Sequence, residues 1–378
     1  MRNTYKVATL ASALCVAAHA NAQSTVTLYG IVDTGFMYVH NSAGQSTQIM
    51  MASGTESGSR WGLKGSEDLG GGLATIFQIE NGFSSTSGAL GQGGKLFGRQ
   101  AYVGLSQANG WGTVTLGRQY DPLIDLVQPV QGDWYLGGFF TSPGDVDNAD
   151  NSQRINNAVK WASPTWAGLQ LSAMYSFGGV AGATGSGQTY SGALAWSAGR
   201  LALAGGYLHI DNGNAVASTR GTSSSDSFFN SSVNAAYASA RSINIARAGG
   251  HYTIGSVILG GYYSYSEYSP DASSTFTRSE KYHNGSVYAV WQITPALLTE
   301  AGYNYMRSLG DSSAKYNQFS LGADYNLSKR TDVYGVISYA HASGTNGAGA
   351  AQAVIGSMDI DSGKSSQAIA TIGLRHKF

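Results

Sequence analysis

The amino-acid sequence predicts an all-β fold, specifically a 16-stranded antiparallel transmembrane β-barrel. Short segments with alternating apolar and polar residues follow one another along most of the chain. The connections between these segments are alternately short and long. Charged residues make up only 12% of the chain, whereas a soluble domain has about 25%. A surface with so few charges is expected of a sheet whose outer face contacts lipid.

The first 22 residues have the features of a secretory signal peptide. Arg2 and Lys6 give a basic start, residues 7–18 are mostly small and apolar, and residues 20–22 form an Ala-Asn-Ala cleavage site. The apolar run is too short to span a bilayer, so an uncleaved anchor is the weaker alternative. We expect residues 1–22 to be removed and residues 23–378 to form one barrel domain.

The cysteine content argues against a protein that depends on disulfides or thiolates, and the charge argues against a nucleic-acid-binding protein. The single cysteine, Cys15, lies within the predicted signal peptide, so the mature chain would contain neither a disulfide nor a thiolate. Removal of Arg2 and Lys6 leaves 20 basic and 22 acidic residues, a net charge of −2. We therefore expect no nucleic-acid partner, because such a partner requires a surplus of basic residues.

The predicted strands are recognised by a period of two. In residues 24–39, for example, Val26, Leu28 and Phe36 share one face, while Thr27 and Asp33 share the other. The sixteen predicted strands are residues 24–39, 59–67, 73–83, 97–107, 111–120, 154–162, 168–177, 189–198, 200–210, 242–254, 256–267, 283–293, 297–307, 316–327, 331–341 and 365–378.

The connections fall into two sets, and all six prolines lie within them, as hydrogen-bonded strands require. The short set is residues 68–72, 108–110, 163–167, 199, 254–255, 294–295 and 328–330. The long, polar set is residues 40–58, 83–96, 121–153, 178–188, 211–241, 268–282, 308–315 and 342–364. An even number of strands with tight turns at one end and long loops at the other is typical of a transmembrane barrel, in which closure satisfies every backbone group.

The last predicted strand, residues 365–378, supports the membrane interpretation. Ile372 and Leu374 share one face of this strand. Arg375 and Lys377 share the other face, which is expected to point into the lumen, and the chain ends on Phe378. A soluble protein usually ends in a polar, frayed tail. A soluble secreted β-protein, such as an adhesin, is therefore the less favoured alternative.

The connection at residues 121–153 is unusually long and acidic. Its 33 residues contain six aspartates but no glutamate, lysine or arginine. At its centre, residues 132–140 read GDWYLGGFF, with neither helical nor strand periodicity. Loops of this length are usually functional or disordered. We expect the four rings, Trp134, Tyr135, Phe139 and Phe140, to pack against the inner wall and hold this loop in place.

Several blocks occur in order along the chain: QSTVTLYGIVDTG, SRWGLKGSEDLGGGLATIFQIENGF, GRQAYVGLS, GTVTLGRQYD, NNAVKWASPTWAGLQLSAMYSF and the terminal GLRHKF. With these blocks the chain resembles the trimeric general-diffusion porins of Gram-negative outer membranes, most closely the β-proteobacterial type. The resemblance implies a homotrimer that passes ions and small hydrophilic solutes, and a third loop folded inward. It also implies contact with outer-membrane lipid and lipopolysaccharide, and recognition of Phe378 by the barrel-assembly machinery.

The resemblance places acids of the third loop opposite arginines on the barrel wall. The residues expected at the pore constriction are Arg60, Arg99 and Arg154 on the wall, Lys64 and Lys160 as second choices, and Asp121 and Asp125 on the loop. Arginine stays charged at all relevant pH values, and screening over about 8 Å would leave the field across a narrow waist intact.

Arg99 shares parity with Ala101, so its lumen position rests on the resemblance. Arg118 is expected at a subunit interface or in a structural salt bridge. The wall arginines favour anions and the loop aspartates favour cations, which leaves the ion preference open.

No catalytic motif is present. The sequence contains no G-x-S-x-G, H-E-x-x-H or P-loop motif, and the histidines lack metal-ligand spacing. We expect no enzymatic activity, no cofactor and no metal. A substrate-specific channel is the main alternative, and saturable flux of one solute would identify it. An outer-membrane β-barrel hydrolase would need a Ser/His/acid cluster on neighbouring strands, and none can be assembled from the sequence.

Overall fold

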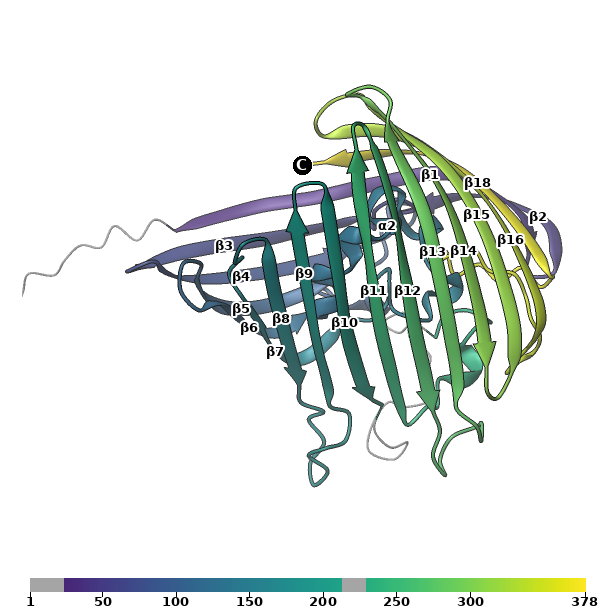
Figure 1. Cartoon of the computed structure of the whole chain (residues 1–378), viewed down its shortest axis with the longest axis horizontal. Coiled ribbons are helices and arrows are strands. Elements are labelled where there is room, and N and C mark those ends of the chain that lie inside the picture. The colour runs from purple at the N-terminus through teal and green to yellow at the C-terminus, as the bar shows by residue number, and fades with distance from the viewer. Residues whose placement is uncertain (1–23, 213–228) are drawn as a thin grey trace, which may run out of the picture.

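The structure is a computed structural model that describes residues 24–212 and 229–378. The predicted signal peptide lies outside the described residues. Strands dominate the described part and form one antiparallel sheet, in which β1 and β18 lie side by side and close the barrel (Figure 1). Within these ranges, no helix is both long enough and apolar enough to cross a bilayer.

The strands follow one another around the sheet in chain order. They are β1 (Thr25–Ser42), β2 (Gln45–Ser53), β3 (Arg60–Gly70), β4 (Leu73–Gly82), β5 (Gln100–Gln107), β6 (Gly112–Gln119), β7 (Ile155–Ala162), β8 (Leu169–Ser176), β9 (Thr189–Ala198), β10 (Leu201–Asp211), β11 (Ser242–Ile254), β12 (Val257–Ser269), β13 (Glu280–Gln292), β14 (Leu297–Leu309), β15 (Ser313–Asn326), β16 (Thr331–Asn346), β17 (Gly349–Ala350) and β18 (Ser366–Lys377).

These labelled strands make a closed barrel of sixteen strands. Both β2 and β3 pair with β1, with Ser53 opposite Thr34 and Arg60 opposite Ile31, so they are two pieces of one barrel strand. The two residues of β17 pair only with the end of β16. The predicted strand number and antiparallel order are therefore confirmed.

The predicted long loop at residues 40–58 is wrong, because most of it is strand. After β1, the chain turns at Ala43 and Gly44, which have φ values of +50° and +81°, and returns as β2. The polar start of β2, Gln-Ser-Thr-Gln, hid this strand from the sequence analysis. Pairing with β1 supplies backbone partners that outweigh the weak local preference. The six residues between β2 and β3, residues 54–59, are called the β2–β3 insert.

The alternation of the two faces is confirmed. On β18, Thr371 and Arg375 are buried, whereas Ile372 and Leu374 are 58% and 51% exposed. The face that carries exposed apolar side chains is called the outer face, and the opposite, more polar face is called the inner face. Exposed apolar residues on one face of a closed barrel form the band that contacts lipid.

Helical turns occur mainly in the connection between β6 and β7, residues 120–154. They are α1 (Pro122–Leu126), η2 (Gln128–Val130), α2 (Asp133–Leu136), η3 (Gly137–Phe140) and η4 (Pro143–Asp145), while η1 (Gln92–Gly94) and η5 (Ala235–Tyr237) lie elsewhere. The sequence predicts an irregular connection here, because these helices are too short to show a period of 3.6. Apolar residues of the connection belong to the same buried cluster as Tyr334 and Val336 of β16.

Candidate functional site

The three predicted arginines lie at or next to strand ends, and two of them lie over the ring of one tyrosine. Arg60 begins β3, while Arg99 and Arg154 directly precede β5 and β7. The guanidinium carbons of Arg99 and Arg154 lie 5.7 and 5.8 Å from the centre of the Tyr120 ring. Arg60 is oriented by its Nε, which donates to the Gly58 carbonyl over 2.9 Å. The aromatic face attracts both cations and fixes their position on the wall.

Arg60, Arg99 and Arg154 are called the arginine wall. A buried glutamate forms an ion pair with one of them, Arg99. Glu80 of β4 is 3% exposed, and its Oε1 lies 2.7 Å from Arg99 Nε. Tyr29 and Tyr120 donate hydrogen bonds to the same carboxylate over 2.8 and 2.9 Å. Arg99 precedes the first residue of β5, so the alternation of that strand does not determine where its side chain points.

The arginine wall lines a cavity of about 810 Å³ that also contacts the β6–β7 connection. The charged residues that line it are Arg60, Arg99, Arg154, Arg375, Lys377, Glu56, Asp125, Asp133 and Asp150. Three rings, those of Tyr120, Trp134 and Tyr135, complete the polar lining. Basic and acidic groups from distant parts of the chain thus meet at one water-accessible space.

The two predicted loop acids have different positions. Asp125 lines the cavity, and its Oδ2 lies 2.6 Å from Lys160 Nζ. Asp121 is fully buried, accepts the Leu123 backbone N–H over 2.8 Å and caps α1. The expectation that Asp121 faces the pore is therefore corrected. A carboxylate at a helix N-cap is held by the first free N–H groups and turned away from solvent.

The two predicted lysines and Arg118 lie beside the cavity and not on it. Lys64 is exposed and its Nζ lies 5.3 Å above the centre of the Tyr29 ring. Lys160 donates to the Tyr120 carbonyl over 2.9 Å in addition to its pair with Asp125. Arg118 donates to the Gly98 carbonyl over 2.8 Å and to Asn156 over 2.6 Å. All three hold neighbouring segments, and neither Lys64 nor Lys160 is among the residues that line this cavity.

The four rings of residues 132–140 divide into two pairs. Phe139 and Phe140 are 0% and 3% exposed and pack in the main apolar cluster. Burying one such ring contributes roughly 1.5–3 kcal/mol. Trp134 is 57% exposed and lines the cavity beside Tyr135, whose ring centre lies 6.0 Å from that of Tyr288. The expectation that Trp134 packs against the wall is corrected, because consecutive residues of α2 point in different directions.

Side chains of the opposite wall hold the backbone of the β6–β7 connection. Gln318 Nε2 and Ser320 Oγ each donate to the Phe139 carbonyl over 2.6 Å. Asn304 Nδ2 donates to the Thr141 carbonyl over 2.9 Å. These donors belong to the buried inner face of β14 and β15. Each buried carbonyl that they satisfy would otherwise carry a desolvation cost of about 1–3 kcal/mol.

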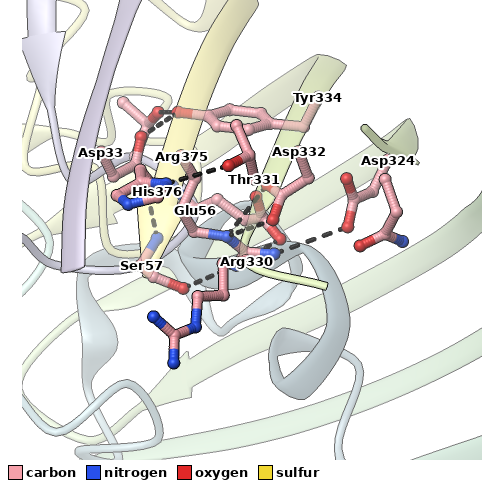
Figure 2. A network of polar contacts seen from close by, with 12 residues as sticks. Asp33, Glu56, Ser57, Asp324, Arg330, Thr331, Asp332, Tyr334, Arg375 and His376 are labelled. Carbon is pink, nitrogen blue, oxygen red and sulfur yellow. Dashed lines mark hydrogen bonds and ion pairs between the residues drawn. The ribbon is translucent and has the colours of Figure 1, made fainter. Parts of the chain in front are cut away.

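The β2–β3 insert supports the same connection from a second side. Asp33 of β1 accepts the backbone N–H groups of Glu56 and Ser57 over 3.0 and 2.8 Å, and the Tyr334 hydroxyl over 2.5 Å (Figure 2). Gly137, at φ +73°, packs where any side chain would overlap the Glu56 carbonyl. The insert therefore requires glycine at position 137.

Arg375 is the central cation of a buried network that the sequence analysis did not assign to the site. It lies 2.7 Å from Glu56 Oε1, 3.0 Å from Asp332 Oδ1 and 3.5 Å from Asp324 Oδ2 (Figure 2). The three carboxylates are close enough together to hold a metal ion, but the guanidinium group of Arg375 already pairs with each of them. The lumen-facing parity of Arg375 on the last strand was the sequence signal for this position.

The chain end is held by the first strand. The backbone groups of Phe378 and Gly30 exchange two hydrogen bonds of 3.0 Å each. A Cβ atom on Gly30 would overlap the Phe378 ring, which is 42% exposed. The terminal ring thus occupies a fixed place beside β1, where only glycine leaves room for it.

Asp145 gives the β6–β7 connection a dependence on pH. Burial, followed by the charges of Asp150 and Asp147, raises the pKa of Asp145 to about 8 from an ordinary 3.8. Between pH 3.8 and about 8, Asp145 is protonated in the folded state and deprotonated in the unfolded state. The free energy of unfolding therefore decreases as the pH rises through this window. The melting temperature should be lower at about pH 9 than at about pH 5, and Asp145→Asn should reduce this difference. Circular dichroism at both pH values would test this, and an unchanged difference in the variant would contradict it.

A closed antiparallel barrel with an apolar outer face and a charged internal cavity defines a channel protein of an outer membrane. Residues 8–345 match the Gram-negative porin family, and the chain belongs to this family. It is therefore an outer-membrane porin, which forms a water-filled channel for passive diffusion of ions and small hydrophilic solutes.

Individual relatives agree with this assignment. An outer membrane porin protein of Bordetella pertussis is 32% identical, over 88% of this chain and 93% of its own length. The outer membrane porin protein 32 of Delftia acidovorans is 28% identical, over 97% of both chains. Among solved structures, an anion-selective porin from Comamonas acidovorans has a TM-score of 0.73 and 24% identity, over 94% of this chain and all of that chain.

Proposed function

We propose that the channel prefers anions, and that Arg60, Arg99 and Arg154 form the positive side of its constriction. The cavity lining carries five basic and four acidic residues, a formal net charge of +1. Two of the acids, Glu56 and Asp125, are paired with Arg375 and Lys160. Burial and the charge of Asp150 raise the pKa of Asp133 well above its usual range. Basic residues thus outnumber acidic residues in the lining, and the raised pKa of Asp133 reduces the negative charge further.

The β6–β7 connection is, in this proposal, folded into the lumen and narrows it. Its hydrogen bonds to inner-face side chains of β14 and β15, and its shared cavity with the arginine wall, support this position. Asp125 and Asp150 would face the arginines across the cavity. A field between these two sides orients polar solutes and makes the entry of apolar molecules unfavourable, because such molecules displace ordered water.

The reversal potential of the unmodified channel tests the proposal. In a planar bilayer with a gradient of potassium chloride, the potential should have the sign that corresponds to a chloride permeability above that of potassium. A potential at zero, or of the opposite sign, would contradict anion preference. The measurement should be repeated at high salt, where screening is expected to weaken the preference.

A substrate-specific channel remains the second candidate, because the exposed Trp134 and the neighbouring Tyr135 could stack on a planar solute. Solute flux from liposomes separates the two: flux proportional to concentration for all small solutes supports the general pore, and saturation by one solute supports the specific channel. We further propose that residues 1–22 direct export and are then cleaved. The barrel-assembly machinery would recognise Phe378 as a signal. The folded chain would form a homotrimer in contact with lipid and lipopolysaccharide, and it would catalyse no reaction.

A further inference from the structure

A row of basic residues crosses the outer face of three neighbouring strands. In the strand register, His283 of β13 lies opposite Arg307 of β14, and Arg307 lies opposite Lys315 of β15. Residues directly opposite one another point to the same face, with Cβ atoms about 4.5–5.5 Å apart. Arg307 and Lys315 are exposed. Both flank the β14–β15 connection, at the end of the barrel where the long connections lie.

The two neighbouring cations have no carboxylate partner among residues 24–212 and 229–378. Lys281, two residues from His283, does have one, because its Nζ lies 3.8 Å from Glu267 Oε1. Glu267 also accepts the Tyr265 hydroxyl over 3.0 Å. Like charges directly opposite one another destabilise a strand pair. An anion that binds both Arg307 and Lys315 would remove this cost.

The residues next to the row place it at a defined depth. Two residues from Lys315 along β15, toward the barrel centre, Asn317 accepts a hydrogen bond of 2.8 Å from the Tyr303 hydroxyl of β14. The rings of Tyr303 and Phe319, which are opposite one another in the register, have centres 4.6 Å apart. Exposed Leu321 follows on the same face. Aromatic residues of transmembrane barrels mark the boundary between hydrocarbon and headgroups, and Lys315 lies about 14 Å beyond Phe319 at the strand rise of about 3.4 Å per residue.

We propose that Arg307 and Lys315, together with His283, bind the headgroup phosphate of a phosphorylated glycolipid in the outer leaflet, of the lipopolysaccharide class. The charged row would contact the phosphate, since Arg and Lys are the side chains that bind phosphate most strongly. The rings of Tyr303 and Phe319 would contact the first part of the acyl chains. The inference gives a site to the lipid partner proposed above, and it does not depend on the ion preference of the channel.

Binding of bisphosphorylated lipid A by the full-length folded protein in neutral detergent tests the site. Loss of two charged contacts in Arg307→Gln/Lys315→Gln should weaken binding by about tenfold or more. The control variant Lys329→Gln/Arg330→Gln removes the same two charges from the exposed turn at the opposite end of the barrel, and its affinity should stay within about twofold of the unmodified protein. Native mass spectrometry can measure all three affinities.

The outcomes separate this inference from the function of the pore. Equal affinity in the unmodified protein and Arg307→Gln/Lys315→Gln would overturn the proposal, as would an equal loss in the control variant. Free inorganic phosphate should not displace the lipid at equimolar concentration; complete displacement would indicate a simple phosphate site and also overturn it. Channel conductance in planar bilayers should be the same in all three proteins, and a lower conductance only in Arg307→Gln/Lys315→Gln would place these residues in the channel instead.

Discussion

The double substitution Arg60→Ala/Arg154→Ala should shift the reversal potential of the channel toward the cation side. Both guanidinium groups line the cavity, on the same side as Tyr120. A unit charge about 6 Å from a passing ion contributes about 0.7 kcal/mol even in bulk water. The loss of two such charges raises the energy of an anion by roughly 1.4 kcal/mol and lowers that of a cation by roughly the same amount, so the anion-to-cation permeability ratio should fall by up to about a hundredfold at low salt.

A matched control makes this result specific to the constriction. Arg200→Ala/Lys329→Ala also removes two cations, but both belong to short turns and neither lines the cavity. This control should leave the reversal potential close to that of the unmodified channel. If both double variants shift the potential equally, overall charge and not the arginine wall sets the preference. An unchanged potential in the Arg60→Ala/Arg154→Ala variant would mean that these arginines do not line the narrowest part.

Arg375→Met should be among the most destabilising single substitutions in the barrel. The side chains of Arg375, Glu56 and Asp332 are 8%, 1% and 2% exposed, so the variant leaves buried carboxylates without a cation. Removal of one partner of a buried ion pair typically costs about 3–5 kcal/mol, because the other charge stays desolvated. The expected result is a markedly lower melting temperature, measured by circular dichroism on the folded protein in detergent.

Two further variants test whether Arg375→Met destabilises the barrel because buried carboxylates lose their cation or because an arginine side chain is lost. Arg330→Met removes an exposed arginine in the neighbouring turn and should change the melting temperature little. Glu56→Gln, added to Arg375→Met, removes one uncompensated carboxylate and should recover part of the loss. A double variant that is no more stable than Arg375→Met would show that the arginine contributes through packing and not through its charge.

The sequence was sufficient for the barrel because the rule behind it is local. Whether a residue such as Ile372 or Thr371 faces lipid depends only on its parity within a strand, and a bilayer imposes the same parity rule on every strand. The same rule correctly placed Arg375 on the inner face. It missed β2, whose polar first residues are ordered by pairing with β1 and not by their own preference.

The predicted residues that line the cavity are three arginines at strand ends, of which Arg99 was placed by the family resemblance, and Asp125 of the β6–β7 connection. Arg60, Arg99 and Arg154 lie at strand ends and meet at the cavity. Asp121 and Trp134 lie in the β6–β7 connection, where no period relates neighbouring residues, and both were placed wrongly. Their directions follow from the N-cap of α1 and from the packing of Phe139 and Phe140, which are tertiary features.

By itself the sequence determined the number of barrel strands, their two faces, the end that carries the long connections and the family of channel. Only the tertiary structure decided which charges meet. Glu56 and Arg375 come from opposite ends of the chain and become partners because β1 and β18 close the barrel. A pair of this kind leaves no local pattern, since its energy comes from desolvation and distance in the folded state.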